Sequence, residues 1–299
     1  MFLIKKIFTS IITLFLVSII SFTVLNVIPG DPILSKLGVD ATKEQVIALK
    51  KEYGLDKAKH IAYIEWTRDA LRGDMGESIK YSTPVNDLIA KRMGVTLNLA
   101  GKAMVITILF GFPLGLLSAM RNKKRGDGFL SIFNMIGISI PSFWIGLLLL
   151  MIFGIYLKVP IKTVTNILPA VTLAVSQISI TSIYLKNIIL EELNKDYVKA
   201  AIARGRGKNE VIITDVLRNI LFPMLTIVSG LFVKILTGSV IVESLFNIPG
   251  LGSLMVLGVE NRDYPVVQAL VLYSAIIVIV TNLFTDLLYS YVDPRVKIS

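Results

Sequence analysis

The chain has 299 residues, of which 54% are hydrophobic and 17% charged, and its formal net charge is +10 at pH 7. An average soluble domain is about 45–50% apolar and about 25% charged, so this composition excludes a disordered chain and argues against a soluble globular enzyme. With no cysteine and a single histidine, His60, a disulfide scaffold and tetrahedral zinc or iron–sulfur sites are excluded, and any Ser-His-Asp triad would have to use His60.

Long apolar runs predict an all-α polytopic membrane protein with six transmembrane helices. A spanning helix needs about 20 mostly apolar residues, whereas the mean helix of a soluble protein has about 11–12. The first run exceeds the core of a signal peptide, about 7–15 residues, so we interpret it as a retained span. The six predicted spans lie at about Ile7–Ile28, Val95–Met120, Phe129–Leu157, Ile167–Leu185, Ile220–Val242 and Val266–Tyr289.

The segment 29–94, between the first two spans, is predicted to fold as a helical cap. Its charges are nearly balanced and its apolar residues are dispersed. Thr42 is placed to cap a helix over Lys43–Tyr53, and a second helix is predicted over Ile61–Leu71, each followed by a glycine. Two interpretations stay open: a docking surface or lid over a pore, or a structural plug without a partner.

The loop between spans four and five, about Lys186–Asn219, is unusually long and has helical spacing of its own. Asp196 is a candidate N-cap for a short helix ending at Gly205, and Val211 to Val216 predict a second amphipathic stretch. Small alanines allow close approach and the glycine allows a bend, which suits a peripheral partner. An interfacial helix resting on anionic lipid fits the composition equally well.

The distribution of Lys and Arg predicts the orientation. The N-terminus, the loop between spans two and three, the loop at 186–219 and the tail at 291–299 carry most of the basic residues of the short connections. Basic residues concentrate in cytoplasmic loops, so both termini are predicted to be cytoplasmic and the segment 29–94 external. The positive charge is then topological, and nucleic-acid binding is not expected.

The predicted division is 1–28 (N-terminus and first span), 29–94 (cap), 95–290 (core) and 291–299 (tail).

Polar groups within predicted spans are candidates for a translocation pathway. Two interpretations of Lys102 and Lys234 stay open: they line such a pathway, or their long side chains extend to the membrane surface. Span four has a polar middle around Ser176 and Gln177, and Ser142 follows the proline in span three.

Because the chain has no Walker A pattern, energy for active transport would come from an ion gradient or a partner. A carrier acting alone would be supported by inverted repeats, which are not evident. An intramembrane enzyme would need a nucleophile and base in the spans, and His60 lies outside them.

The chain contains a series of short motifs in a fixed order. Together they resemble the inner-membrane permease subunit of binding-protein-dependent ABC importers, in the dipeptide/oligopeptide/nickel group, and are similar to the first permease of the pair, which has the large external loop. The motifs are Ile28–Pro32, Tyr53–Asp56, Leu71–Ser78, Ile140–Trp144, Leu168–Ala170, Pro249–Gly252, Arg262–Gln268 and Asp293–Arg295.

The long loop resembles the coupling loop of that family, written as Glu-Ala-Ala, three residues, then Gly. Lys199 stands in place of the Glu, and the later Ile-x-Leu-Pro portion is not reproduced at its usual spacing. The resemblance implies that the helix from Asp196 to Gly205 docks into a groove of a separate ATPase. The residues implied in this coupling are Asp196, Tyr197, Ala200, Ala201 and Gly205. We expect Gly205→Pro and Ala201→Trp to fold normally and to uncouple ATP hydrolysis from transport.

The resemblance also implies partners and a location. These are a second permease subunit in a heterodimer, two ATPases that use ATP and Mg, and an external solute-binding protein that docks around Asp31, Asp74 and Arg262, all at a bacterial inner membrane with its lipid. No cofactor is expected on this chain, which is then a transport subunit and not an enzyme. Di- or oligopeptides are the favoured solute, and nickel or a metal chelate is the alternative within the family.

Overall fold

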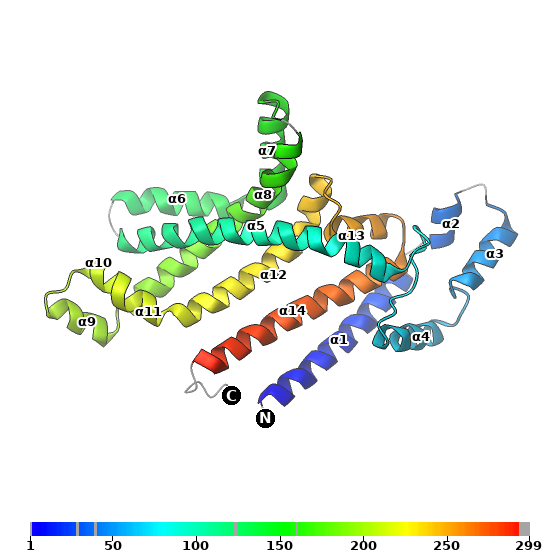
Figure 1. Cartoon of the computed structure of the whole chain (residues 1–299), viewed down its shortest axis with the longest axis horizontal. Helices are drawn as coiled ribbons and strands as arrows, with labels where there is room; N and C mark the ends of the chain where they lie inside the picture. Colours follow the sequence, from blue (N-terminus) through cyan, green and yellow to red (C-terminus); the bar gives the residue numbers. More distant parts are fainter. Residues whose placement is uncertain (1, 28–29, 39–40, 122–124, 160, 293–299) are drawn as a thin grey trace. The chain divides into compact units, whose positions relative to one another are not determined.

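The computed structural model in Figure 1 describes residues 2–27, 30–38, 41–121, 125–159 and 161–292. The predicted all-α class is confirmed: over these residues the elements are helices, and the only extended pairing is an isolated β-bridge between Glu77 and Pro84. The described chain forms two compact units. One contains residues up to 96 together with 249–283, and the other contains residues 97–248 with the end of the last helix.

Within the described residues, five helices are long and apolar enough to span a membrane. They are α1 (Phe2–Val27), α5 (Val85–Met120), α8 (Ile161–Glu192), α12 (Leu221–Leu245) and α14 (Tyr264–Val292). They correspond to five of the six predicted spans, with α5 and α8 extending beyond the apolar runs. Within a membrane, backbone groups must be paired inside each segment, which is why uninterrupted apolar runs become continuous helices.

The remaining predicted span, Phe129–Leu157, is not one straight helix. It consists of α6 (Arg125–Ser139), α7 (Ser142–Leu149) and the π-helix η1 (Leu150–Tyr156), with a bend of 96° between α6 and the following pair. The break lies at Pro141, which lacks a backbone N–H and keeps the preceding residue out of the helical conformation. The described residues therefore contain five straight candidate spans, or six if this bent pair counts as one.

The cap is confirmed as helical, with α2 (Pro32–Leu37), α3 (Lys43–Glu52) and α4 (Lys59–Leu71). The predicted cap of α3 is present as a reciprocal capping box. The Gln45 N–H donates to Thr42 Oγ1 at 3.3 Å, and the Thr42 N–H donates to Gln45 Oε1 at 3.0 Å. Gly73, which follows α4, has φ +88°, a conformation that favours glycine.

The first unit is held together by an apolar cluster that joins the cap to the later part of the chain. It comprises Met75, Val85 and Ile89 on one side and residues of α13 (Leu251–Glu260) and α14 on the other. The α13 helix begins directly after the motif residues Pro249 and Gly250. The N–H of Leu251 donates to Thr96 Oγ1 at 2.8 Å, which fixes the start of α13 against α5.

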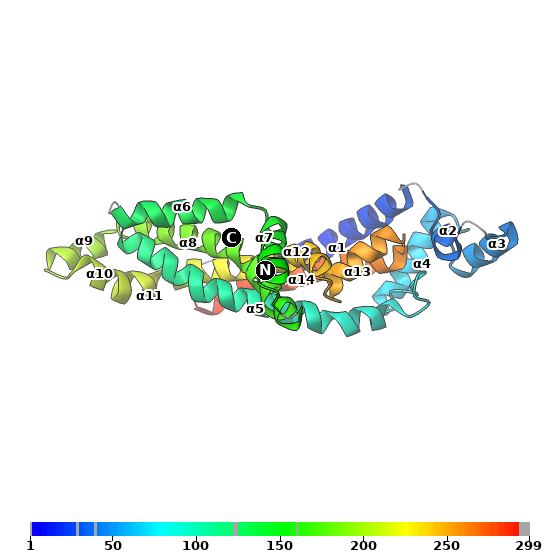
Figure 2. The same ribbon diagram turned by 90° about the horizontal axis from the view of Figure 1, so that it is seen from above.

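In the second unit, α6, α7 and α12 pack against α8, and these helices are drawn from two directions in Figures 1 and 2. The Gly111-x-x-x-Gly115 pattern of α5 lies against α8. A Cβ at Gly115 would lie 2.8 Å from the carbonyl oxygen of Ser182 and 2.9 Å from Leu185 Cβ. The glycine is therefore required by close helix packing, as small-xxx-small patterns are in membranes.

Gly115→Ala is expected to lower the thermal unfolding midpoint of the purified protein in detergent. Alanine improves helix propensity by roughly 0.5–1 kcal/mol, but overpacking of a tight contact costs about 1–3 kcal/mol, so the packing effect wins. The matched control on the same helix is Gly101→Ala, whose new Cβ meets nothing within 4 Å. The control is expected to keep or raise the midpoint, and equal midpoints for the two variants would contradict this packing.

Candidate functional site

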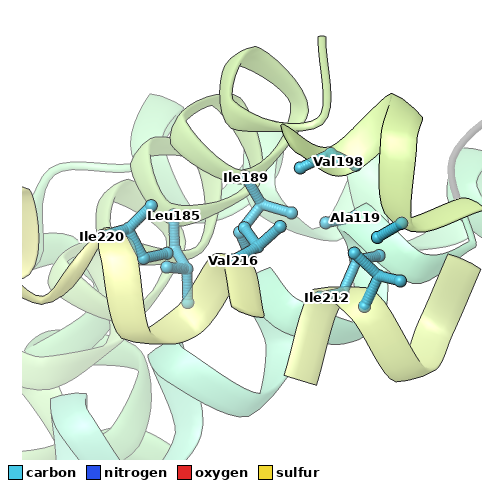
Figure 3. Packing of buried hydrophobic residues seen from close by; sticks show 9 residues of the cluster. Ala119, Leu185, Ile189, Val198, Ile212, Val216 and Ile220 are labelled. Carbon is cyan, nitrogen blue, oxygen red and sulfur yellow. The ribbon is translucent and has the colours of Figure 1, made fainter. Parts of the chain in front are cut away.

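The loop after α8 is a compact helical layer packed on the ends of α5 and α8. It comprises α9 (Asp196–Ala203), α10 (Lys208–Val211), the π-helix η2 (Ile212–Val216) and α11 (Leu217–Asn219). Figure 3 shows its apolar side chains converging on those of α5 and α8. The buried residues of this loop cluster are Ala119, Leu185, Ile189, Val198, Ala201, Val211, Ile212, Val216 and Ile220. The predicted amphipathic stretch from Val211 to Val216 is confirmed.

The short helix α9 has a buried face and an exposed face. Val198 and Ala201 are 0% and 1% exposed and belong to the loop cluster, whereas Asp196, Lys199 and Ala200 are exposed. The prediction that Asp196 is the N-cap is wrong by one residue. Lys195 occupies that position, and the Asp196 carboxylate instead accepts from Lys199 Nζ at 3.1 Å. A partner in contact with α9 can reach Ala200 but not Ala201.

Two expectations about variants in this helix are corrected by the geometry. Gly205 has φ +89°, which proline cannot adopt because its ring holds φ near −65°. Tryptophan at position 201 has no room, because Ala201 is packed within the loop cluster. Gly205→Pro and Ala201→Trp are therefore expected to disturb the loop itself, so neither can isolate an effect on coupling.

Tyr197 anchors α9 to the end of α8. Its hydroxyl donates to Glu192 Oε1 at 2.9 Å, and the other carboxylate oxygen of Glu192 pairs with Lys195 Nζ at 2.7 Å. Burial raises the pKa of Tyr197, and the Glu192 carboxylate raises that pKa further, so the hydroxyl stays a donor. Tyr197 thus orients the helix from its inner side.

Arg206 closes the loop and was not singled out from the sequence. Its Nε donates to Glu210 Oε1 at 3.0 Å, and its two terminal nitrogens reach Asp215 Oδ2 at 2.5 Å and Thr214 Oγ1 at 2.6 Å. The guanidinium holds the pKa of Asp215 below its usual value. An Arg fork with two carboxylates and a hydroxyl joins the glycine turn to η2. The i, i+4 spacing of Arg206 and Glu210 was the signal available in the sequence.

Among the proposed pathway residues, Lys102 lies in an open pocket of about 700 Å³ in the second unit. Lys102 and Asn98 are one helical turn apart on α5 and both line this pocket, so one face of the helix offers a cation and an amide to the same space. The remaining lining is mostly small or apolar. The lining residues are Asn98, Gly101, Lys102, Val105, Ile106, Ile167 and Ala170.

Ser176 and Gln177 lie further along α8, outside that pocket. Ser176 Oγ and Gln177 Oε1 are buried and have no hydrogen-bond partner among the described residues. An unpaired buried polar atom costs about 1–3 kcal/mol, so these two atoms are candidates for contact with solute or with another chain. Ser142 is half-buried at the start of α7, and Lys234 is exposed on α12. The structure does not bring Ser142 or Lys234 to the Lys102 pocket.

The three residues assigned to binding-protein docking have different surroundings. Asp31 caps α2 by accepting from the Ile33 N–H at 3.0 Å, and it pairs with Lys50 at 2.5 Å. Burial alone would raise the pKa of Asp31, but the hydrogen bond from Lys50 outweighs burial, so this pKa is lowered. Asp74 is exposed and accepts from the Gly76 N–H at 2.8 Å. Arg262 lies directly against Gly30, near Asp31.

A buried carboxylate next to Arg262 joins two of the motifs. Asp263 is 1% exposed and accepts from Ser78 Oγ at 2.5 Å, from the Ile79 N–H at 3.1 Å and from the Lys80 N–H at 3.2 Å. It therefore binds a turn of the cap to the start of α14. The sequence placed both residues in motifs but offered no sign that they meet, because they are far apart in the chain.

Comparison with known proteins identifies the family of this chain. The family described as binding-protein-dependent transport system inner membrane component matches residues 111–298, and its N-terminal component matches residues 1–100. This chain belongs to that family of permeases. It is 35% identical to the oligopeptide transport system permease protein AppB of Bacillus subtilis and 33% identical to the dipeptide transport system permease protein DppB of Lactococcus lactis, each over 99% of both chains. A probable peptide ABC transporter permease protein of Sinorhizobium fredii is 33% identical over the same share.

The residues of the permease that the structure describes contain no group of three or more His, Asp or Glu side chains placed to hold a metal ion. The motif Asp293–Arg295 and the tail 293–299 lie outside the described residues.

In this permease, Asp263→Asn is expected to loosen the cap turn. Asparagine keeps the size but directs an NH₂ group at donors that the carboxylate accepts, at a cost of about 1–3 kcal/mol. The measurement is hydrogen–deuterium exchange of residues 76–82, which should become faster. Glu77→Gln is the control, because this neighbouring carboxylate is exposed. If hydrogen–deuterium exchange of residues 76–82 is unchanged in Asp263→Asn, the assigned role of Asp263 in holding the cap turn is wrong.

Proposed function

We propose that this chain is a permease subunit of an ATP-binding-cassette importer that takes di- or oligopeptides across the inner membrane. The observation that carries the proposal is full-length similarity, at 33–35% identity, to permeases named for oligopeptide and dipeptide transport. Both termini are cytoplasmic in this proposal, which places the loop after α8 on the cytoplasmic side and the cap outside. A second permease, two ATPases that bind ATP and Mg, and an external solute-binding protein complete the assembly.

The packing of the loop after α8 supports its role in coupling. Its exposed face, with Asp196, Lys199 and Ala200, is available to a groove of an ATPase. Its buried face contacts Ala119 of α5 and Leu185 and Ile189 of α8. Because well-packed interiors are stiff, a push on α9 is transmitted to the two spanning helices that line the Lys102 pocket. Alternating access would follow from rocking of these helices against the second permease.

The Lys102 pocket is the proposed part of the pathway within this chain. A peptide carries a carboxylate, amides and side chains of varied size, and the pocket supplies one cation and one amide on an otherwise apolar wall. Such a lining binds the groups that all peptides share and does not select among their side chains. The polar atoms of Ser176 and Gln177 would be paired by solute or by the second subunit.

Uptake measurements test the solute. Deletion of this chain is expected to abolish uptake of labelled di- and oligopeptides and to leave nickel uptake unchanged, with restoration by a plasmid copy. Loss of nickel uptake alone would replace the solute and keep the mechanism. If neither uptake changes and no ATPase co-purifies with the chain, the importer proposal is wrong.

Ala200→Trp tests the coupling face. The side chain at position 200 is exposed, so the variant should fold with an unchanged unfolding midpoint but should lose co-purification of the ATPase and reduce peptide uptake at least about tenfold, equivalent to about 1.4 kcal/mol of binding. Asn209→Trp, which places the same bulk on exposed α10, is the control and should retain both. Normal ATPase association in Ala200→Trp would show that α9 is not the docking helix.

A further inference from the structure

A second pocket, of about 320 Å³, lies in the first unit between α1 and the cap helix α4. One wall is apolar and comes from the last turns of α1, with Ile19, Phe22 and Val27. The other side carries Lys59 and His60 from the first turn of α4. The full lining is Ile19, Phe22, Thr23, Asn26, Val27, Lys59, His60 and Tyr63. No part of the coupling or solute pathway described above uses this pocket.

Three contacts between α1 and α4 define the walls. Tyr63 packs edge-on against Phe22 with ring centroids 5.3 Å apart, and its hydroxyl shares a 2.8 Å hydrogen bond with Ser18 Oγ. Lys59 Nζ donates to the backbone oxygen of Asn26 at 3.0 Å. Aromatic packing therefore closes the pocket at one end and Lys59 lies at the open end, which gives it an apolar floor and a positive mouth.

The cation at the mouth has unused donors. An ammonium group has three N–H donors, and Lys59 uses one for Asn26. Over the described part of the chain, no carboxylate pairs with Lys59, whereas nearby Lys57 is paired with Glu65 at 2.5 Å. The charge of Lys59 thus remains available to an anion beside an apolar groove.

The groove is continuous with the apolar surface of α1. Ile20, Val24 and Val27 are 59%, 51% and 71% exposed on this helix. Tyr63 lies on α4 against Ser18 and Phe22 of α1, with Trp66 beside it, whereas Lys59 lies at the end of α1 through Asn26. The apolar wall matches the acyl chain of a phospholipid, and the cation at the end of the span matches its phosphate.

We propose that this pocket binds one anionic phospholipid of the leaflet next to the cap, with an acyl chain against Ile19, Phe22 and Val27 and its phosphate at Lys59 and His60. The bound lipid would fill the space between α4 and α1 and so hold the cap at its angle to the membrane. The proposal needs only the membrane location of the chain and is independent of the solute.

Native mass spectrometry of the purified permease complex tests this site, with phosphatidylglycerol and phosphatidylcholine of equal chain length as probes. Lys59→Gln combined with His60→Gln should reduce retention of phosphatidylglycerol at least about fivefold, since a lysine near the membrane surface contributes about 1 kcal/mol toward anionic lipid. Both positions are exposed and glutamine is polar, so the double variant should fold. Lys51→Gln, at an exposed lysine of α3, is the control and should retain lipid. Equal retention of both lipids, or no effect of the double variant, would overturn the proposal.

Two further arms separate the lipid from other occupants. Inorganic phosphate should leave the unfolding midpoint unchanged where phosphatidylglycerol raises it; an equal rise would reduce the site to a simple anion site. Thr23→Trp, which fills the groove from an exposed position, should remove lipid retention while the complex still assembles. The chain has no cysteine, so Thr23→Cys provides a single attachment point. Cross-linking of this cysteine to the second permease would show that protein, not lipid, covers the pocket.

Discussion

Burial of the apolar face of the loop after α8 against α5 and α8 is the contact on which the proposed mechanism depends. The loop is too short and too irregular to hold a shape alone, because isolated helices under about 12–15 residues are marginal in water. The loop cluster supplies the missing stability, and the Arg206 fork and the Tyr197–Glu192 pair then set the orientation of α9. In the proposed mechanism, a partner force applied to α9 would reach the spanning helices because the buried face of α9 packs in the same cluster as side chains of α5 and α8.

The sequence predicted the elements governed by local or nearest-neighbour rules. Apolar runs marked the spans, and Thr42 marked the start of α3. The break at Pro141 was visible as a residue but not as a bend, because proline is tolerated within α5 and α8, at Pro113 and Pro169, without ending either helix. Which of these outcomes occurs depends on tertiary packing that a single sequence does not contain.

The candidate site shows the same limit more sharply. The family resemblance assigned both Ala200 and Ala201 to coupling, but only the fold decides which of two adjacent positions faces inward. Asp263 and Ser78 both lay in motifs, and the hydrogen bond between them depends on the meeting of segments far apart in the chain. Lys102 was identified by its charge in an apolar run, and its pocket became visible only when α8 was placed beside α5.

The contact between Gly30 and Arg262 has a consequence for how this family varies. The guanidinium of Arg262 occupies the space where a Cβ at position 30 would lie. Any side chain at position 30 therefore requires a shorter residue, or a different rotamer, at position 262. Substitutions at these two positions should appear as correlated pairs among relatives, and recombination that exchanges only one of the two segments between diverged permeases should yield chains in which the cap no longer closes on the turn before α14.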